Sequence, residues 1–331
     1  MTIRINNHEN GPDGRHLSRP VYLRITGLLV ILLTAGLYVY IFHDRLNIIT
    51  TIESDQLALL LGVSVLMVIA TGWTNALLLK ILDVRLSFLE FSTLSFLTSF
   101  ANYFGPFRAG SAVRASYLRL VKHLPISAFA GVMVANSVIL LFVSSGAGLV
   151  MLIFEWYSSR TLSLPLLAAR VLILGFSAFL KVVKFPSVSR EGRIWNMLRL
   201  ALSGLEKIRK HRTGLIEVIA SILLQYVVAA LVVKYAYGAM GIEVSILVSA
   251  LIGVFNAMSG YLSITPNNIG LQEAVIGYLG AVSGLGLADS LVAAALIRAA
   301  QVLVIFVLSP PSWYLLLRPA GITMMGRPRE N

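Results

Sequence analysis

The sequence predicts an all-helical membrane protein, a bundle of about six to eight spans. Apolar segments of roughly 20 residues, long enough to cross a bilayer, recur along the chain. These segments lack the alternating pattern of barrel strands, and helices are then the structure that pairs every backbone amide inside hydrocarbon. Charged residues make up only 13% of the 331 residues, which is about half of their share in soluble domains.

Six of the apolar segments are uninterrupted and two are broken. The six predicted spans are Tyr22–Phe42, Leu57–Leu79, Ala128–Phe154, Leu164–Val183, Leu215–Tyr237 and Leu291–Leu317. Of the broken regions, Leu86–Phe104 runs into Gly105-Pro106, and Ile246–Leu287 is interrupted by Pro266-Asn267-Asn268. A transmembrane domain over residues 21–317 is therefore expected between two cytoplasmic tails, residues 1–20, which should be disordered, and residues 318–331.

The loop charges predict the orientation of the spans. Loop 43–56 has a net acidic balance and should be external, whereas loop 184–213 is rich in Lys and Arg and should be cytoplasmic. Both termini are then cytoplasmic, in an inner membrane. The net charge of +12 follows from the same positive-inside bias and does not indicate a nucleic-acid partner. The chain has no cysteine and no histidine pair at ligand spacing, so no metal or other cofactor is expected.

The first broken region creates a conflict between charge and topology. Segments 80–85 and 105–125 are both basic and should both be cytoplasmic, although a single crossing by residues 86–104 would separate them. A re-entrant hairpin or broken helix removes the conflict; the alternative is a complete span with misplaced positive charge. The second broken region is compatible with two short spans or with two re-entrant halves, and the sequence does not decide between them.

The two breaks share the pattern P-x-x-x-G, at Pro106–Gly110 and at Pro266–Gly270. Helix breaks at corresponding positions of two halves suggest an inverted repeat with a binding site near the membrane midplane. The helix that starts after each break presents backbone N–H groups that favour an anion, such as a lipid phosphate. The glycines would allow close backbone approach. We therefore expect both breaks to face one polar cavity.

Charged residues accompany both breaks. Arg108 and Arg114 flank the first, as contacts for a headgroup or as positive-inside anchors. A charge inside a span costs at least about 2.5–3.5 kcal/mol, so Glu273 and Arg298 are expected to pair, either at a substrate site or only as a fastener between helices. Glu90 has either a partner or a snorkelling position.

Four amide residues, Asn102, Asn136, Gln225 and Asn256, are expected to form hydrogen bonds between helices. Asn102 also belongs to the candidate substrate site, which contains no proposed catalytic residue. The candidate binding residues are Asn102, Pro106, Arg108, Gly110, Arg114, Pro266, Asn267, Asn268, Gly270, Glu273 and Arg298.

The stretches around both breaks resemble a known family. Residues 102–118 (NYFGPFRAGSAVRASYL) and 266–274 (PNNIGLQEA) are similar to the two signatures of the lysylphosphatidylglycerol synthase transmembrane-region family, and Arg298 matches a later intramembrane arginine. The resemblance implies a flippase-like, lipid-handling bundle. It does not imply synthase activity, because aminoacyl transfer in that family belongs to a separate soluble domain, for which we expect no room in the roughly 14 residues after the last span.

The sequence departs from the family pattern at three places. Ser111 stands where the family usually has Glu, Asn267 and Asn268 replace glycines, and Asn136 lies where a charged cluster is common. These departures imply a changed substrate or a weaker coupling mechanism.

Three functional classes follow. The first is a flippase-like transporter that binds and moves a lipid or a lipid-linked anionic intermediate. The second is an intramembrane lipid-modifying transferase, against which the absence of D-x-D, H-E-x-x-H and G-x-S-x-G motifs counts. The third is a non-transporting scaffold that recruits a membrane enzyme through loop 184–213. Anionic membrane lipids are the expected ligands, and a homo-oligomer or an enzyme partner is compatible with each class.

Overall fold

The computed structural model describes residues 54–103, 110–159, 211–260 and 266–316. All of them belong to the unit Ile48–Asn331; the other unit, Met1–Asn47, lies outside the described residues. Over these ranges the chain is helical and has no strand, as predicted. Four of the described helices are long and apolar enough to cross a membrane. They are α2 (Ser54–Lys80), α5 (Ile126–Ser159), α8 (Arg212–Gly238) and α11 (Leu287–Leu316).

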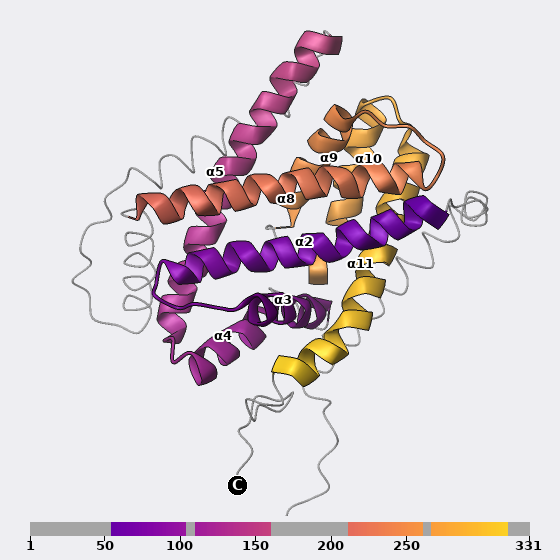
Figure 1. The fold of residues 1–331 in the computed structure, drawn as a ribbon. Helices are drawn as coiled ribbons and strands as arrows, with labels where there is room; N and C mark the ends of the chain where they lie inside the picture. The colour runs from indigo at the N-terminus through magenta and orange to yellow at the C-terminus, as the bar shows by residue number, and fades with distance from the viewer. Residues whose placement is uncertain (1–53, 104–109, 160–210, 261–265, 317–331) are drawn as a thin grey trace, which may run out of the picture. The chain divides into compact units, whose positions relative to one another are not determined.

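Each of these long helices coincides with a predicted span to within a few residues. The predicted spans Tyr22–Phe42 and Leu164–Val183 fall outside the described residues. Figure 1 shows α2 and α8 running across the view, with α5 and α11 inclined to them.

The two broken regions form pairs of short helices. The helices are α3 (Phe88–Tyr103), α4 (Gly110–Val121), α9 (Ile246–Ser259) and α10 (Leu271–Val282), with a short 3₁₀ turn, η2 (Pro266–Asn268), before α10. The four contain 12 to 16 residues, or about 18–24 Å at 1.5 Å per residue. None of these four therefore reaches across a hydrocarbon core of about 30 Å.

The described helices repeat in the order long, short, short, long. The offset in sequence between Ser54 and Arg212, which begin α2 and α8, is the same as the offset between Phe88 and Ile246, which begin α3 and α9. The later members of each set, α4 with α10 and α5 with α11, are separated by a slightly larger offset, which is again the same for both pairs. The chain thus contains two repeats of matching helical order, α2 to α5 and α8 to α11, and the second repeat has a small insertion near its break.

The turns also repeat. Ser87 and Ser245, which are separated by the same offset as the starts of α2 and α8, cap α3 and α9. They accept backbone N–H bonds from Glu90 and Val248, each at 3.3 Å. Before these caps the chain turns through Asp83 (φ 64°) and Gly241 (φ 70°), which also occupy corresponding positions. The correspondence therefore extends from helix order to individual turns.

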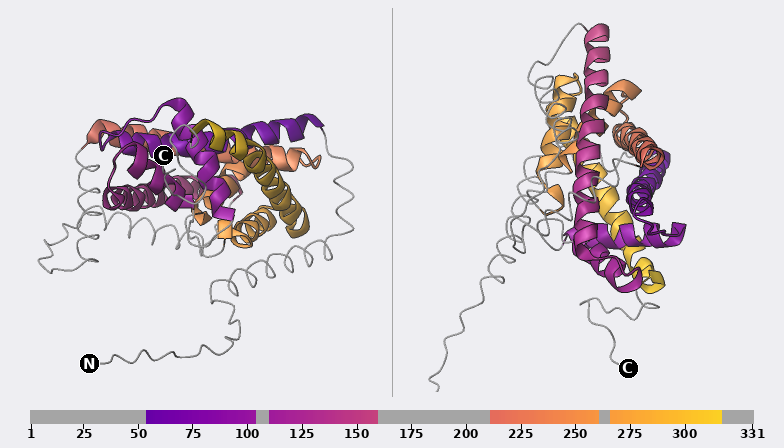
Figure 2. Two further views of the ribbon diagram at one scale, coloured as in Figure 1. Left: turned by 90° about the horizontal axis from the view of Figure 1, so that it is seen from below. Right: turned by 90° about the vertical axis from the view of Figure 1, so that its left-hand side faces the viewer.

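Helices α2 and α8 are antiparallel neighbours, which Figures 1 and 2 both show. Lys80, at the end of α2, pairs with Glu217, near the start of α8, at 2.9 Å. Farther along, the hydroxyls of Thr74 and Ser221 are 2.9 Å apart. Because corresponding helices of the two repeats run in opposite directions here, the repeats have the relation expected of an inverted repeat.

Two apolar clusters lie on either side of a polar middle layer. The first joins α3, α4 and α5 to Leu78 and Leu79 of α2 and to Val218 and Ile222 of α8. The second joins α9, α10 and α11 to the later part of α8, and it includes Leu60 of α2. Between these clusters the facing parts of α2 and α8 carry polar residues, and that polar layer positions the candidate site.

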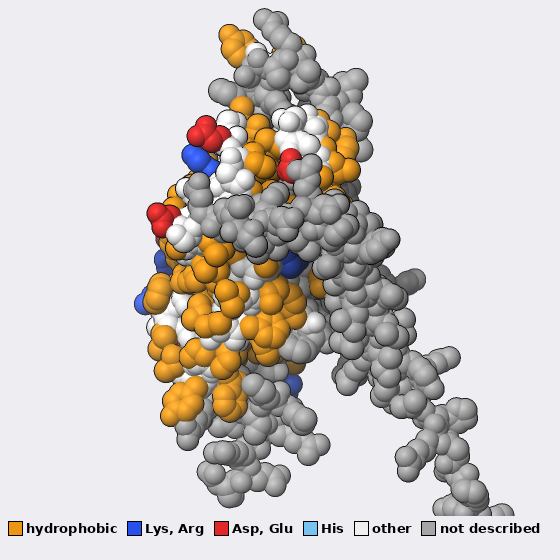
Figure 3. Space-filling view, turned by 90° about the vertical axis from the view of Figure 1, so that its right-hand side faces the viewer, with side chains coloured by type: hydrophobic (Ala, Val, Ile, Leu, Met, Phe, Trp, Pro, Cys, Tyr) orange, Lys and Arg blue, Asp and Glu red, His pale blue; other side chains and the backbone are white. Residues whose placement is uncertain are grey.

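The outer surface is largely apolar. Figure 3 shows hydrophobic side chains over much of the described surface of one face, with a few charged side chains, most of them along its left edge. On α11, Leu303, Val307 and Leu315 are each at least half exposed. Large exposed apolar areas are unusual for soluble proteins, so this surface fits contact with lipid chains.

Candidate functional site

The first break, residues 104–109 between α3 and α4, lies outside the described residues, but the helix ends on both sides are described. The backbone N–H of Gly110 donates to Oδ1 of Asn102 at 2.8 Å. A Cβ at Gly110 would lie 1.9 Å from the carbonyl oxygen of Thr98. The predicted close backbone approach at Gly110 is confirmed, and Asn102 closes the hairpin across the break.

The second break, residues 260–270 between α9 and α10, has a matching link. Nδ2 of Asn268 donates to the carbonyl oxygen of Gly260 at 2.7 Å. Like Asn102 and Gly110, these two residues are eight positions apart. The asparagine lies before the first break but within the second. The two breaks are therefore closed by similar hydrogen bonds with opposite chain direction.

Left-handed backbone bends the chain within the second break. Asn267 and Asn268 have φ values of 46° and 54°, and Gly270 has a φ of 88°. Asparagine is among the few residues other than glycine that adopt positive φ readily. Nothing lies within 4 Å of a Cβ placed on Gly270, so the expected close approach is wrong there. The backbone angle is what favours glycine at 270.

Glu273 and Arg298 form the predicted pair. Nε of Arg298 donates to Oε1 of Glu273 at 2.7 Å, and the side chains of Arg298 and Glu273 are 15% and 20% exposed, respectively. The guanidinium also donates to the carbonyl oxygens of Asn267 at 3.1 Å and Asn268 at 3.4 Å. Arg298 of α11 thus holds both the carboxylate of α10 and the backbone of the second break.

The first N–H group after each break already has an acceptor within the protein. At the second break Oε2 of Glu273 accepts from the backbone N–H of Gly270 at 2.8 Å; at the first, Asn102 occupies the corresponding place. The expectation that these N–H groups bind an anion therefore does not hold for Gly110 and Gly270.

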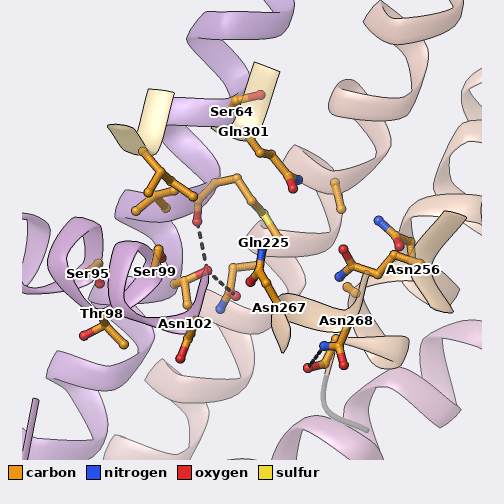
Figure 4. A pocket seen from close by; sticks show the side chains of 18 of the residues that line it. Ser64, Ser95, Thr98, Ser99, Asn102, Gln225, Asn256, Asn267, Asn268 and Gln301 are labelled. Carbon is orange, nitrogen blue, oxygen red and sulfur yellow. Dashed lines mark hydrogen bonds between the residues drawn. The ribbon is translucent and has the colours of Figure 1, made fainter. Parts of the chain in front are cut away.

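A polar pocket of about 290 Å³ lies between the two breaks (Figure 4). Asn102, Ser111 and Arg114 line it from the first repeat, and Asn267, Asn268 and Arg298 from the second. Ser64 and Thr71 of α2 and Gln225 of α8 contribute from the middle of the two long helices. The expected shared cavity between the flanks of the breaks is present.

Arg114 and Arg298 are the basic residues of this pocket, and no acidic residue is among those that line it. Arg114 is only 7% exposed, which argues against a role as a solvent-exposed anchor. The positive charge of Arg298 is compensated by Glu273, which stands just behind the lining. Arg114 thus places a second buried guanidinium in the lining, from α4.

The remaining predicted site residues occupy supporting positions or lie outside the description. Gly110, Gly270 and Glu273 do not line the pocket but shape its walls. Pro106 and Arg108 fall outside the described residues, as does the side chain of Pro266, whose backbone forms the start of η2. Their proposed roles stay predictions.

Glu90 has a partner rather than a snorkelling position. Its carboxylate lies 2.6 Å from Nζ of Lys122 and accepts from the hydroxyl of Tyr117 at 2.8 Å. Burial alone would raise the pKa of Glu90, but the hydrogen bonds from Lys122, Ser87 and Tyr117 outweigh it and lower the pKa to about 2. The pair joins the start of α3 to the end of α4, away from the pocket.

The four amides that were expected to bond between helices divide into two groups. Gln225 meets the expectation through Thr71 and Thr74 of α2, and Asn102 bonds to the start of α4. Oδ1 of Asn136 and Oδ1 of Asn256 have no hydrogen-bond partner among the described residues, and both residues line the pocket. For these oxygens the expectation is wrong.

The sequence reasoning missed several pocket residues on the long and short helices. These are Ser64, Thr71, Asn75, Ser95, Thr98, Ser99, Gln272 and Gln301. A usable signal was present, because Ser95, Thr98, Ser99 and Asn102 recur at helical spacing on one face of α3. A polar face within a short apolar helix is a sign of a polar cavity.

Comparison with known families decides the affiliation. The model of the lysylphosphatidylglycerol synthase TM region matches residues 24–309. The chain belongs to this family. No curated protein matches the chain. In this member of the lysylphosphatidylglycerol synthase TM-region family, all three departures from the family pattern noted above line the pocket, at Ser111, Asn136 and Asn267–Asn268. Membership supports a membrane location and a role connected with lipids.

Proposed function

We propose that the protein binds the anionic headgroup of a membrane lipid in the pocket and moves the lipid between leaflets, as a flippase-like transporter. The observation that carries this proposal is the polar pocket between the flanks of two helix breaks that belong to corresponding places of the two repeats. Broken helices at the interface of inverted repeats are a common construction of transport sites.

The position and charge of the pocket support the proposal. Thr71 lies in the middle of α2, and Gln225 lies in the middle of α8, so the pocket would sit near the membrane midplane if both helices span. Arg114 supplies a buried positive charge, and a guanidinium binds phosphate with two parallel hydrogen bonds. Polar groups of the pocket would thus replace the water around the headgroup while it crosses the membrane.

The proposed membrane arrangement follows from the loop charges and from the lengths of the short helices. Both short-helix pairs re-enter and return to the face from which they came, the first from the cytoplasm and the second from outside. Loop 184–213 and both termini then lie on the cytoplasmic side of an inner membrane. Single cysteines at Asn47 and Ser189 should label from opposite sides of the membrane, which is a clean test because the chain has no cysteine. Labelling from the same side would contradict this topology.

Transport can be tested with the full chain in phosphatidylcholine vesicles that contain fluorescent phosphatidylglycerol. Dithionite destroys the fluorophore in the outer leaflet, and a transporter should let it bleach the inner-leaflet lipid faster than in protein-free vesicles. Arg114→Gln should slow this phase, whereas Lys80→Gln, which alters only an exposed pair, should not. Equal rates with and without protein would refute transport, and a chemically altered lipid would favour the transferase.

A further inference from the structure

Resting on the proposed function, we infer that the pocket recognises a hydroxyl-rich headgroup, a sugar or cyclic polyol linked to the lipid. The reason is the chemistry of its polar lining residues, among which carboxamides are the most frequent. Those that line it are Asn75, Asn102, Asn136, Gln225, Asn256, Asn267, Asn268, Gln272 and Gln301. Figure 4 shows several of these side chains around one space, drawn from α3, α8, α9, η2 and α11.

Carboxamides and hydroxyls are complementary because each group both donates and accepts hydrogen bonds. A phosphate only accepts when ionised, so it would use the N–H half of each amide and leave the oxygens unmatched. An ammonium group only donates, so it would use the oxygen of each amide and leave the N–H groups unmatched; it would also lie beside Arg114 and Arg298 in a lining that contains no acidic residue. A ring that carries several hydroxyls can bond both to the N–H groups and to the oxygens of the amides.

Buried acceptors in the wall support this reading. Asn136 and Asn268 are 4% and 6% exposed, yet Oδ1 of each has no hydrogen-bond partner among the described residues. The same holds for Oγ of Ser95, which is 2% exposed. A buried polar atom without a partner is costly, and hydroxyl groups of a ligand would supply donors to these three atoms once their side chains turn toward the pocket that the residues line.

The size of the pocket agrees with one ring. Its volume of about 290 Å³ is close to the lower end, about 300 Å³, of the range of small-molecule pockets. Apolar residues complete the lining, among them Met67, Leu140 and Ile305, and they can pack against the C–H faces of a ring. Arg114 remains placed to bind the phosphate that joins such a ring to its lipid.

The test compares dioleoyl lipids that separate the two chemistries. The full chain in phosphatidylcholine nanodiscs is titrated with phosphatidylinositol, phosphatidic acid and glucosyl diacylglycerol, and binding is followed by native mass spectrometry. Phosphatidylinositol should bind at least about tenfold more tightly than phosphatidic acid, since a site built to hydrogen-bond hydroxyls rejects an analogue that lacks them. Glucosyl diacylglycerol should also bind more tightly than phosphatidic acid.

Variants sharpen this test. Asn136→Leu should remove most of the preference for phosphatidylinositol over phosphatidic acid, because the leucine keeps the shape of the asparagine but not its hydrogen bonds. Gln301→Leu serves the same purpose if the first variant does not fold. Gln56→Leu makes the same kind of change outside the pocket, and it should leave the preference intact.

The outcomes separate this inference from the proposed function. Equal binding of phosphatidylinositol and phosphatidic acid would overturn hydroxyl recognition but leave binding of an anionic lipid standing. Failure of all three lipids to bind would overturn both. Binding of soluble inositol 1-phosphate as tight as that of phosphatidylinositol would support hydroxyl recognition and overturn the lipid as its source.

Discussion

The two breaks reach similar geometry by different chemistry. At the first, α3 and α4 are joined by a neutral hydrogen bond, from Gly110 to Asn102, and by backbone contact at Gly110. At the second, the Asn268 link is supplemented by a guanidinium that holds a carboxylate and two carbonyl groups. The first hairpin has its own ion pair, Glu90–Lys122, but at the opposite end.

This difference shows how two repeats of similar structure can have different roles. At the second break, Arg298 of α11 binds the carboxylate of Glu273 and the carbonyl groups of Asn267 and Asn268, so we expect this part to stay in place. The described flanks of the first break pack closely at Gly110, share the neutral Gly110–Asn102 bond and carry the buried charge of Arg114. We therefore expect the first hairpin to be the part that shifts during transport, against a second hairpin that stays in place.

The largest test of the comparison is removal of Arg298. Arg298→Ala leaves Glu273 without its partner and releases two carbonyl groups, which should lower stability by about 3–5 kcal/mol. Thermal unfolding of the detergent-solubilised protein measures this loss. The double variant Glu273→Gln with Arg298→Gln should be milder than the sum of its single changes. Additive losses would show that the ion pair does not fix the second break.

The corresponding test of the first break is Gly110→Ala. The added Cβ would overlap the Thr98 carbonyl, and the displacement of α4 should cost about 1–3 kcal/mol. Gly62→Ala is a suitable control, because no neighbour lies within 4 Å of a Cβ at that glycine of α2. If both variants melted alike, close backbone contact could not be what holds α3 to α4.

The two asparagines offer a smaller and more selective test. Asn102 must accept from an N–H group and Asn268 must donate to a carbonyl, so the same change should affect them differently. Asn102→Asp keeps an acceptor beside the start of α4 and should be tolerated. Asn268→Asp loses the donor and should cost about 1–3 kcal/mol. If the two variants changed the melting temperature equally, Asn102 would not act as an acceptor and Asn268 as a donor in these two hydrogen bonds.

The smallest expected effect concerns Glu90 and depends on pH. Because its folded-state pKa is lowered from 4.5 to about 2, its contribution should be complete above pH 4.5 and disappear as pH falls toward 2. Partial exposure of the pair limits the contribution to about 1 kcal/mol. The melting difference between wild type and Glu90→Gln should therefore shrink over this interval. A difference that stayed constant would exclude the lowered pKa.

The sequence predicted the helices and the ion pair well because the underlying forces are local or strong. Apolar runs of sufficient length form α2, α5, α8 and α11, and charges placed within such runs need partners, as Glu273 and Arg298 do. Proline and glycine marked both breaks for the same local reason.

The pocket lining was harder to predict because it depends on the direction in which each polar side chain turns. Asn136 and Gln225 look alike in sequence, as single amides within apolar helices. Only packing shows that Gln225 bonds to α2, while the oxygen of Asn136, a residue that lines the pocket, has no partner among the described residues. Gly270 illustrates the same limit. From the sequence alone, a glycine that is needed for a positive φ looks the same as one that is needed for close backbone contact.

The crossing of α2 and α8 has a consequence for biosynthesis. Leu60 and Val218 occupy corresponding positions of the two repeats, and both are fully buried, each in the apolar cluster of the other repeat. When the first repeat leaves the ribosome, the places for Val218 and Ile222 in its cluster are still empty. Each repeat supplies buried residues to the apolar cluster of the other repeat. The first repeat can therefore complete its folding only after the second has been synthesised.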